Sequence, residues 1–93
     1  MAAKRIHIYV RGFVQGVFFR ANTQRVAASL SLKGWVRNVG DDGVEMVAEG
    51  EQKDLEQLLA WCYDGPSRSK VEKVEKQWSE ATGEFSSFQI IYS

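Results

Sequence analysis

An arginine stands where a strand pattern changes into a helix pattern, directly after a loop that contains glycine. Residues 10–20 read Val-Arg-Gly-Phe-Val-Gln-Gly-Val-Phe-Phe-Arg. Gly12 and Gly16 can adopt positive φ, which lets successive backbone N–H groups turn toward one centre. The first helical turn adds unpaired N–H groups and the positive end of the helix dipole. Arg20 adds a planar fork of donors that fits phosphate or carboxylate. Such a junction is therefore suited to an anion.

The same loop has a simpler interpretation, since glycines between a strand and a helix are also typical of a plain turn. No Gly-Lys-Ser/Thr follows the loop, so it is not a Walker loop, and the Gly-x-Gly-x-x-Gly spacing of dinucleotide-binding proteins is absent. Residue types and spacing alone leave the turn and the anion site open.

Other chemically active side chains are few. Cys62, the single cysteine, excludes an internal disulfide and a cysteine-rich zinc site, and its place on an apolar helical stripe predicts a buried small hydrophobe. His7, the single histidine, falls on the polar side of a strand, where a surface role is expected. No cluster of His, Cys and carboxylates has ligand spacing. We therefore expect no metal and no cofactor.

Alternation and helical periodicity predict the elements that must position the loop. Alternating apolar residues predict strands over residues 4–10, 35–39, 44–49, 71–78 and 85–92. Helical spacing predicts one helix over residues 20–32, with a buried stripe of Thr23, Val26, Ala27 and Leu30. A second helix opens at residues 50–54 and carries a stripe of Leu55, Leu58, Leu59 and Cys62. Gly34 is expected to end the first helix, and Asp-Gly at residues 42–43 predicts a hairpin.

This order predicts an α+β fold, βαββαβ with a short extra strand. Two such halves form a ferredoxin-like α/β sandwich, in which an antiparallel sheet carries both helices on one face. Right-handed crossovers place the first and third strands in the middle of the sheet. With 93 residues, the chain is expected to form a single domain spanning residues 1–93.

Charge and hydropathy narrow the classes of partner. Twelve basic and twelve acidic residues cancel, which argues against broad binding to nucleic acid or a membrane surface. The sequence has neither a long apolar run nor a signal-peptide pattern. We expect a cytoplasmic monomer.

Two ordered motifs resemble the signatures of the acylphosphatase family. The first is Val10-x-Gly12-x-Val14-Gln15-Gly16-Val17-x-Phe19-Arg20, which matches that family's pattern at every specified position, and the second is Gly34-Trp35-Val36-Arg37-Asn38. The resemblance covers nearly the whole chain and implies the same ferredoxin-like fold.

The resemblance also implies a reaction, the hydrolysis of an acyl phosphate to a carboxylate and inorganic phosphate by in-line attack of water. In that reading Arg20 and Asn38 are the catalytic residues, and Asn38 holds the attacking water. The phosphate-binding loop comprises Val14, Gln15, Gly16, Val17, Phe18, Phe19 and Arg20. No cofactor is implied, because a carboxylate is a good leaving group and phosphoryl transfer gains mostly from positioning and charge stabilisation.

The chain departs from the family pattern at two positions. The second signature usually has glycine four positions after the asparagine, where this chain has Asp42 and then Gly43. Val44 and Gly50 keep their offsets, so the change is expected to stay within the turn. Val39 stands where some members have a hydroxyl residue, which weakens any role for a hydroxyl there.

Two other functions are compatible with this fold. Ferredoxin-like sheets can bind single-stranded RNA through aromatics on central strands, but residues 44–49 have no aromatic and two acids. Acylphosphatase-like domains also work inside larger maturation or carbamoyl-transfer proteins. Because this chain ends after one domain, we expect a stand-alone enzyme.

Overall fold

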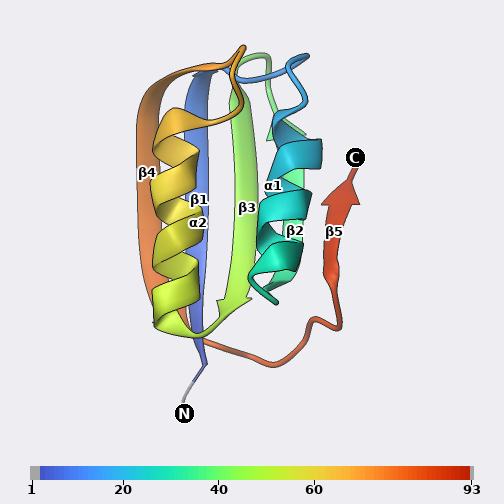
Figure 1. The fold of residues 1–93 in the computed structure, drawn as a ribbon, viewed down its shortest axis with the longest axis vertical. Coiled ribbons are helices and arrows are strands. Elements are labelled where there is room, and N and C mark those ends of the chain that lie inside the picture. The colour runs from blue at the N-terminus through green and yellow to red at the C-terminus, as the bar shows by residue number, and fades with distance from the viewer. Residues whose placement is uncertain (1–2, 93) are drawn as a thin grey trace.

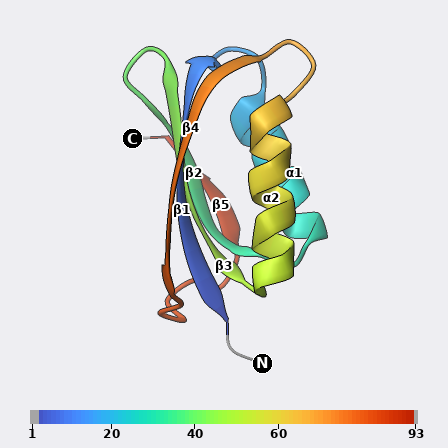
Figure 2. The ribbon, with the colours of Figure 1, turned by 90° about the vertical axis from the view of Figure 1, so that its left-hand side faces the viewer.

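A computed structural model describes residues 3–92 as two layers, a five-stranded sheet with two helices on one of its faces (Figures 1 and 2). The elements in chain order are β1 (Lys4–Phe13), α1 (Phe19–Ser29), β2 (Lys33–Val39), β3 (Gly43–Gly50), α2 (Gln52–Asp64), β4 (Lys70–Glu80) and β5 (Phe88–Ile91). Neither helix of residues 3–92 has the length and apolar character needed to cross a membrane.

The strand order is β4-β1-β3-β2-β5, which places β1 and β3 in the middle as predicted. β1 pairs antiparallel with both β3 and β4, and β2 pairs antiparallel with β3. β5 pairs parallel with β2, so the expected antiparallel sheet holds for four strands and is wrong for the fifth. The reason is the connection after β4, which crosses below the sheet to the far edge and sends β5 upward beside β2 (Figure 1).

The core lies between the sheet and the helices and includes the predicted stripes. Ile6, Ile8 and Val10 of β1 are fully buried, as the alternation of this strand predicts. On the helices, the completely buried positions are Thr23 and Ala27 in α1 and Leu55, Leu58 and Cys62 in α2. The predicted stripe residues Val26, Leu30 and Leu59 pack against this core while remaining partly exposed.

Helix α1 ends at Ser29, three residues before the predicted end at residue 32. Ser31 adopts a left-handed φ of 58°, and the N–H of Leu32 turns back to the carbonyl of Ala27 at 2.9 Å, which closes the helix. The prediction that Gly34 ends the helix is therefore wrong. It lies in β2, where a Cβ would collide with the carbonyl of Val47 on the neighbouring strand.

β1 extends to Phe13, so Gly12 lies within this strand and not in the loop. The pairing with β4 shifts register between Arg11 and Gly12, which indicates a β-bulge. Gly12 has a φ of 137°, and a Cβ there would collide with the carbonyl of Lys70. Its glycine therefore serves the close approach of two strands, and the loop between β1 and α1 comprises residues 14–18.

Candidate active site

The loop between β1 and α1 is held by three buried apolar side chains. Val14, Val17 and Phe19 reach into the core and are almost inaccessible to solvent. Between them, Gly16 takes a left-handed φ of 76° and Phe18 takes φ 63° and ψ 28°. A left-handed conformation is uncommon for a bulky residue, and in Phe18 it forms the N-cap of α1. The loop therefore turns sharply while its apolar side chains hold it to the core.

Helix α1 begins without a side-chain cap. Among residues 3–92, no side chain accepts a hydrogen bond from its first turn, and that turn contains no acidic residue. The first bond of the helix runs from the N–H of Asn22 to the carbonyl of Phe18, at 3.0 Å. The N–H groups of Phe19, Arg20 and Ala21 therefore have no intrahelical acceptor, and they carry the positive end of the helix dipole. This arrangement is suited to binding an oxyanion.

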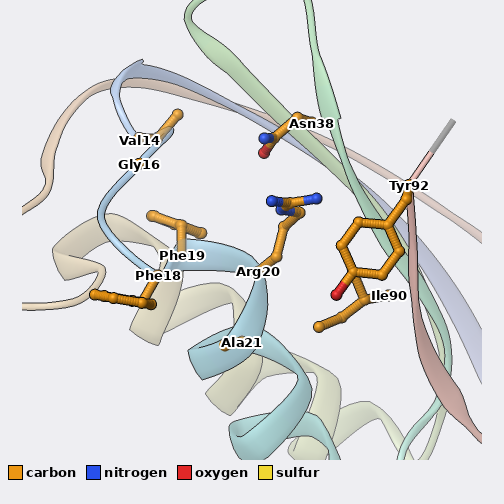
Figure 3. Close-up of a pocket in the computed structure, with 9 residues that line it drawn as sticks. All are labelled: Val14, Gly16, Phe18, Phe19, Arg20, Ala21, Asn38, Ile90 and Tyr92. Carbon is orange, nitrogen blue, oxygen red and sulfur yellow. The ribbon is translucent and has the colours of Figure 1, made fainter.

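The structure brings Arg20 and Asn38 together at one pocket of about 280 Å³. Asn38 follows Val36 by two residues on β2, so its side chain points to the same face of the sheet, toward the start of α1. Figure 3 shows the Asn38 amide above the Arg20 guanidinium, with the two side chains pointing toward one another. An anion on the loop would therefore have an arginine and an amide beside it.

Most of the residues predicted for this site line the pocket, and two do not. The lining includes Asn38 and five members of the predicted loop, which are Val14, Gly16, Phe18, Phe19 and Arg20. Val17, whose side chain is in the core, and Gln15, whose side chain bonds to the hairpin after Asn38, are not among the lining residues. The predicted role of their backbone N–H groups stays a prediction.

Three lining residues escaped the sequence analysis, Ala21, Ile90 and Tyr92. Ile90 pairs with Val36 in the parallel ladder between β2 and β5, which carries the end of the chain to the pocket. Tyr92 lies with its ring centre 5.0 Å from the guanidinium carbon of Arg20. The sequence offered no signal for this, because the apolar pattern of residues 85–92 predicts a strand without saying which strand it pairs with.

The arginines near the pocket differ in their partners. Arg37 points to the other face of the sheet, where its guanidinium and His7 both bond Glu45, at 2.7 and 2.6 Å. Burial raises the pKa of Glu45, but the hydrogen bonds from His7 and Arg37 outweigh burial and leave that pKa lowered. Arg20, by contrast, makes no ion pair with a carboxylate of residues 3–92. Arg20 is therefore the arginine placed to bind an anion from outside.

The departure from the family pattern at Asp42 lies within the hairpin turn that follows Asn38. The pairing of β2 with β3 runs without a shift from Lys33 opposite Glu49 to Val39 opposite Gly43. Asp42 lies in the turn, where its carbonyl accepts a 2.9 Å hydrogen bond from the N–H of Gly12. The replacement of glycine by Asp42 thus stays within the turn, and the strand register that positions Asn38 is uninterrupted, as expected.

Cys62 is a core residue, as predicted. Its thiol is completely buried and donates to the sulfur of Met46 at 3.8 Å. Burial raises the pKa of this thiol to about 12, so it stays protonated and is a poor nucleophile near neutral pH. Across residues 3–92, no three side chains of His, Cys, Asp or Glu gather as a set of metal ligands.

Together, these features define a class of protein, a small ferredoxin-like domain in which the start of a helix, an arginine and an amide meet at one pocket. Comparisons with known proteins narrow this class. The acylphosphatase family model matches residues 6–90. Acylphosphatase of Chloroflexus aurantiacus is 47% identical over 88 residues, covering 95% of this chain and 96% of that protein. That of Marinobacter nauticus is 48% identical over 92 residues, covering 99% and 100%. The chain belongs to the acylphosphatase family.

Solved structures agree with this assignment and show how widely the fold is used. The crystal structure of acylphosphatase from Bacillus subtilis matches with a TM-score of 0.91 at 35% identity, covering 96% of this chain and 99% of that one. T. kodakarensis HypF matches with a TM-score of 0.84 at 35% identity, but the match covers only 12% of HypF. The BLUF protein BlrB matches with a TM-score of 0.72 at 12% identity, a likeness of fold alone.

Proposed function

We propose that the pocket between residues 14–20 and Asn38 is the catalytic site at which this acylphosphatase hydrolyses the carboxyl–phosphate bond of small acyl phosphates. One observation carries the proposal: the Arg20 guanidinium and the Asn38 amide meet in one pocket at the uncapped start of α1. The pocket thus combines groups for a phosphoryl anion with a group for water.

The phosphoryl oxygens would be held by the loop and the start of α1. The backbone N–H groups of residues 14–20 and the positive end of the helix dipole supply donors that are fixed before the substrate arrives. Arg20 adds a permanent charge and two parallel N–H donors, which fit two phosphoryl oxygens at once. These groups also stabilise the charge that the phosphoryl oxygens carry in the transition state.

Asn38 would orient the attacking water by accepting or donating a hydrogen bond through its amide. The water oxygen forms a bond to phosphorus while the bond from phosphorus to the acyl oxygen breaks, and the acyl group leaves as a carboxylate. The proton of the water passes to a phosphoryl oxygen of the substrate. Because the leaving group is a weak base, this route needs no acidic side chain and no basic side chain of the protein.

The roles of Arg20 and Asn38 separate in an experiment that measures turnover and phosphate affinity on folded variants. Asn38→Ala should lower turnover on the order of 10²–10³-fold, the cost of removing one catalytic amide. It should leave the affinity for inorganic phosphate nearly unchanged, because the loop and Arg20 remain. Arg20→Lys keeps the charge and loses the planar fork, so it should weaken phosphate binding and lower turnover sharply.

Turnover is measured by phosphate release from benzoyl phosphate, and affinity by calorimetry with inorganic phosphate. The thermal unfolding of each variant must resemble that of the wild type, since Asn38 also lies in a strand. Full turnover in Asn38→Ala, or a loss of phosphate affinity as large as in Arg20→Lys, would show that Asn38 does not position the water.

Several properties expected from the sequence stay predictions. We infer that residues 1–93 act as a single domain, as a cytoplasmic monomer, without a metal and without binding nucleic acid or membranes. The near-complete coverage of the stand-alone relatives supports the single domain, and the balanced charge supports the absence of nucleic acid. Light scattering, cell fractionation, and activity after exhaustive chelation test the monomer, the location and the metal in turn.

A further inference from the structure

The side chain of Gln15 ties the phosphate loop to the hairpin that follows Asn38. Its amide nitrogen donates to the backbone carbonyls of Gly40 at 2.9 Å, Gly43 at 3.0 Å and Val39 at 3.3 Å. An amide nitrogen has two N–H donors, so two hydrogens serve three acceptors that surround it. A single side chain thus spans a separation of 24 to 28 residues along the chain.

These bonds connect the two halves of the catalytic site. The loop and Arg20 belong to the connection from β1 to α1, whereas Asn38 belongs to β2. Val39, whose carbonyl accepts from Gln15, is the residue directly after Asn38. One further bond, from the N–H of Gly12 near the end of β1 to the carbonyl of Asp42 at 2.9 Å, joins β1 to the same hairpin turn.

We propose that Gln15 is a positioning residue, which sets the distance between the phosphoryl group on the loop and the water on Asn38. The proposal rests on the proposed function, because it acts through Asn38. The Gln15 side chain is not among the residues that line the pocket, so it has no direct contact with the substrate. Its effect on the reaction comes from holding two structural elements in register.

The physical reason is that attack on phosphorus depends on a short and well-aligned approach of the water. A misplacement of about 1 Å can cost on the order of 10² in rate. The hairpin turn is exposed from Gly40 to Asp42, and Gly40 takes a left-handed φ of 60°, so this turn has little packing of its own. A donor that bonds three of its carbonyls restricts the turn at the end of β2 nearest the pocket.

The test is a double-mutant cycle between Gln15 and Asn38. Gln15→Met keeps the length of the side chain and removes both donors. It should lower kcat ten- to a hundredfold, on the order of the cost of a misplaced reactant. The affinity for inorganic phosphate, measured by calorimetry, should stay close to that of the wild type. In an Asn38→Ala background, Gln15→Met should cause no further drop, because the water is already unheld.

Gln24→Met is the matched control. Gln24 also donates its amide to a backbone carbonyl, that of Phe88 at 3.1 Å, but on the side of α1 that faces β5. The substitution Gln24→Met therefore removes the same kind of hydrogen bond and should lower stability to a similar extent. Its effect on kcat should be small and should multiply with that of Asn38→Ala. Should Gln15→Met fail to fold, Gln15→Leu, which also has no donor and adds no charge beside the loop, replaces it.

Three outcomes overturn the proposal. The first is an effect of Gln15→Met on kcat that multiplies with that of Asn38→Ala, because the two residues would then act independently. The second is a loss of phosphate affinity that matches the loss of kcat, which would place Gln15 in the shape of the loop itself. The third is full turnover in folded Gln15→Met. A failure of the proposed function differs from all three, since Asn38→Ala alone would then keep its turnover.

Discussion

The two ends of the central strand β3 each carry a loop held by one polar side chain, in opposite ways. At the end near the pocket, Gln15 donates to three carbonyls of the hairpin. At the other end, Glu49 accepts from the backbone N–H groups of Thr82 and Gly83, at 2.9 and 3.0 Å, and from the Thr82 hydroxyl at 3.0 Å. Figure 1 shows the two loops at opposite ends of the sheet.

At the Glu49 end, hydrogen-bond donors of the same kinds as those at the pocket surround an anion that the chain itself supplies, the Glu49 carboxylate. Two backbone N–H groups and the guanidinium of Arg5, at 3.1 Å, surround its carboxylate, which is 7% exposed. Burial raises the pKa of Glu49, but the bonds from Thr82 and Gly83 outweigh burial, and the pKa is lowered. The chain thus stabilises a carboxylate with the same kinds of group that the pocket presents to a substrate.

The two ends differ in whether the chain supplies the anion. Where it does, the donors form a structural link, and where it does not, the same kinds of donor are available as a binding site. Glu49 satisfies the donors at its own end, so that end holds the connection between β4 and β5. At α1, no side chain caps the first turn, and the loop is held instead through acceptors on the hairpin. Because carbonyls of the hairpin hold the loop, the N–H groups of the loop remain available to phosphate in the proposed function.

The largest expected difference between the two ends lies in their arginines. Arg20→Ala should lower turnover on the order of 10³–10⁵-fold, the range found for arginines that stabilise a transferring phosphoryl group. It should change the free energy of unfolding little. Arg5→Ala should leave turnover unchanged and lower the free energy of unfolding by about 1–3 kcal/mol, because the buried carboxylate of Glu49 loses a donor.

Turnover of benzoyl phosphate and unfolding in urea measure the two effects on the same preparations. The comparison fails if Arg5→Ala lowers the turnover of folded protein, or if Arg20→Ala unfolds the chain. A swap of the two effects would place the substrate at the Glu49 end.

Local periodicity was sufficient to predict those parts of the fold that repeat along the chain. The alternation of Ile6, Ile8 and Val10 and the helical spacing of Leu55 and Leu58 report burial against one face, and these residues are buried. The order of elements then placed β1 and β3 in the centre through the handedness of the crossovers. For the site, the family resemblance singled out Arg20 and Asn38, and the structure places both at one pocket.

The unpredicted parts depend on contacts between residues far apart in sequence. Glu49 reads as one of two acids on an alternating strand, and it is buried because Thr82 and Gly83 fold over it. Gly12 and Gly34 read as loop and cap glycines, but each is required by the backbone of a neighbouring strand. No local pattern contains such information, since the partner residues lie tens of positions away.

A smaller effect concerns the charge of Glu49. Glu49→Gln should lower the free energy of unfolding near neutral pH by about 1–2 kcal/mol, because hydrogen bonds to a charged acceptor are replaced by bonds to a neutral one. The folded-state pKa of Glu49 is lowered, so its stabilising contribution is present above the unfolded-state pKa and is lost as pH falls through the folded-state pKa. The two proteins should therefore converge in stability in acid.

Urea unfolding of both proteins from neutral to acidic pH measures this convergence. Glu45, whose pKa is also lowered, titrates in both proteins and cancels in the difference. A difference that stays constant down to low pH would mean that Glu49 acts through its shape and not through its charge. Turnover should be equal in the two proteins at neutral pH, because Glu49 lies at the end of β3 away from the pocket.

The smallest expected effect comes from Cys62, which lies in the core and belongs to neither loop. Cys62→Ala removes a buried sulfur that contacts Met46, so the free energy of unfolding should fall by roughly 1 kcal/mol. Turnover and phosphate affinity should both stay at wild-type values. A substitution at the pocket end of β3 should change turnover, and one at the Glu49 end should change stability, in both cases through specific polar contacts. A core change should instead lower stability through packing alone. Cys62→Ala that folds fully and yet loses turnover would contradict this, since it would require a covalent step at a thiol whose pKa burial raises to about 12.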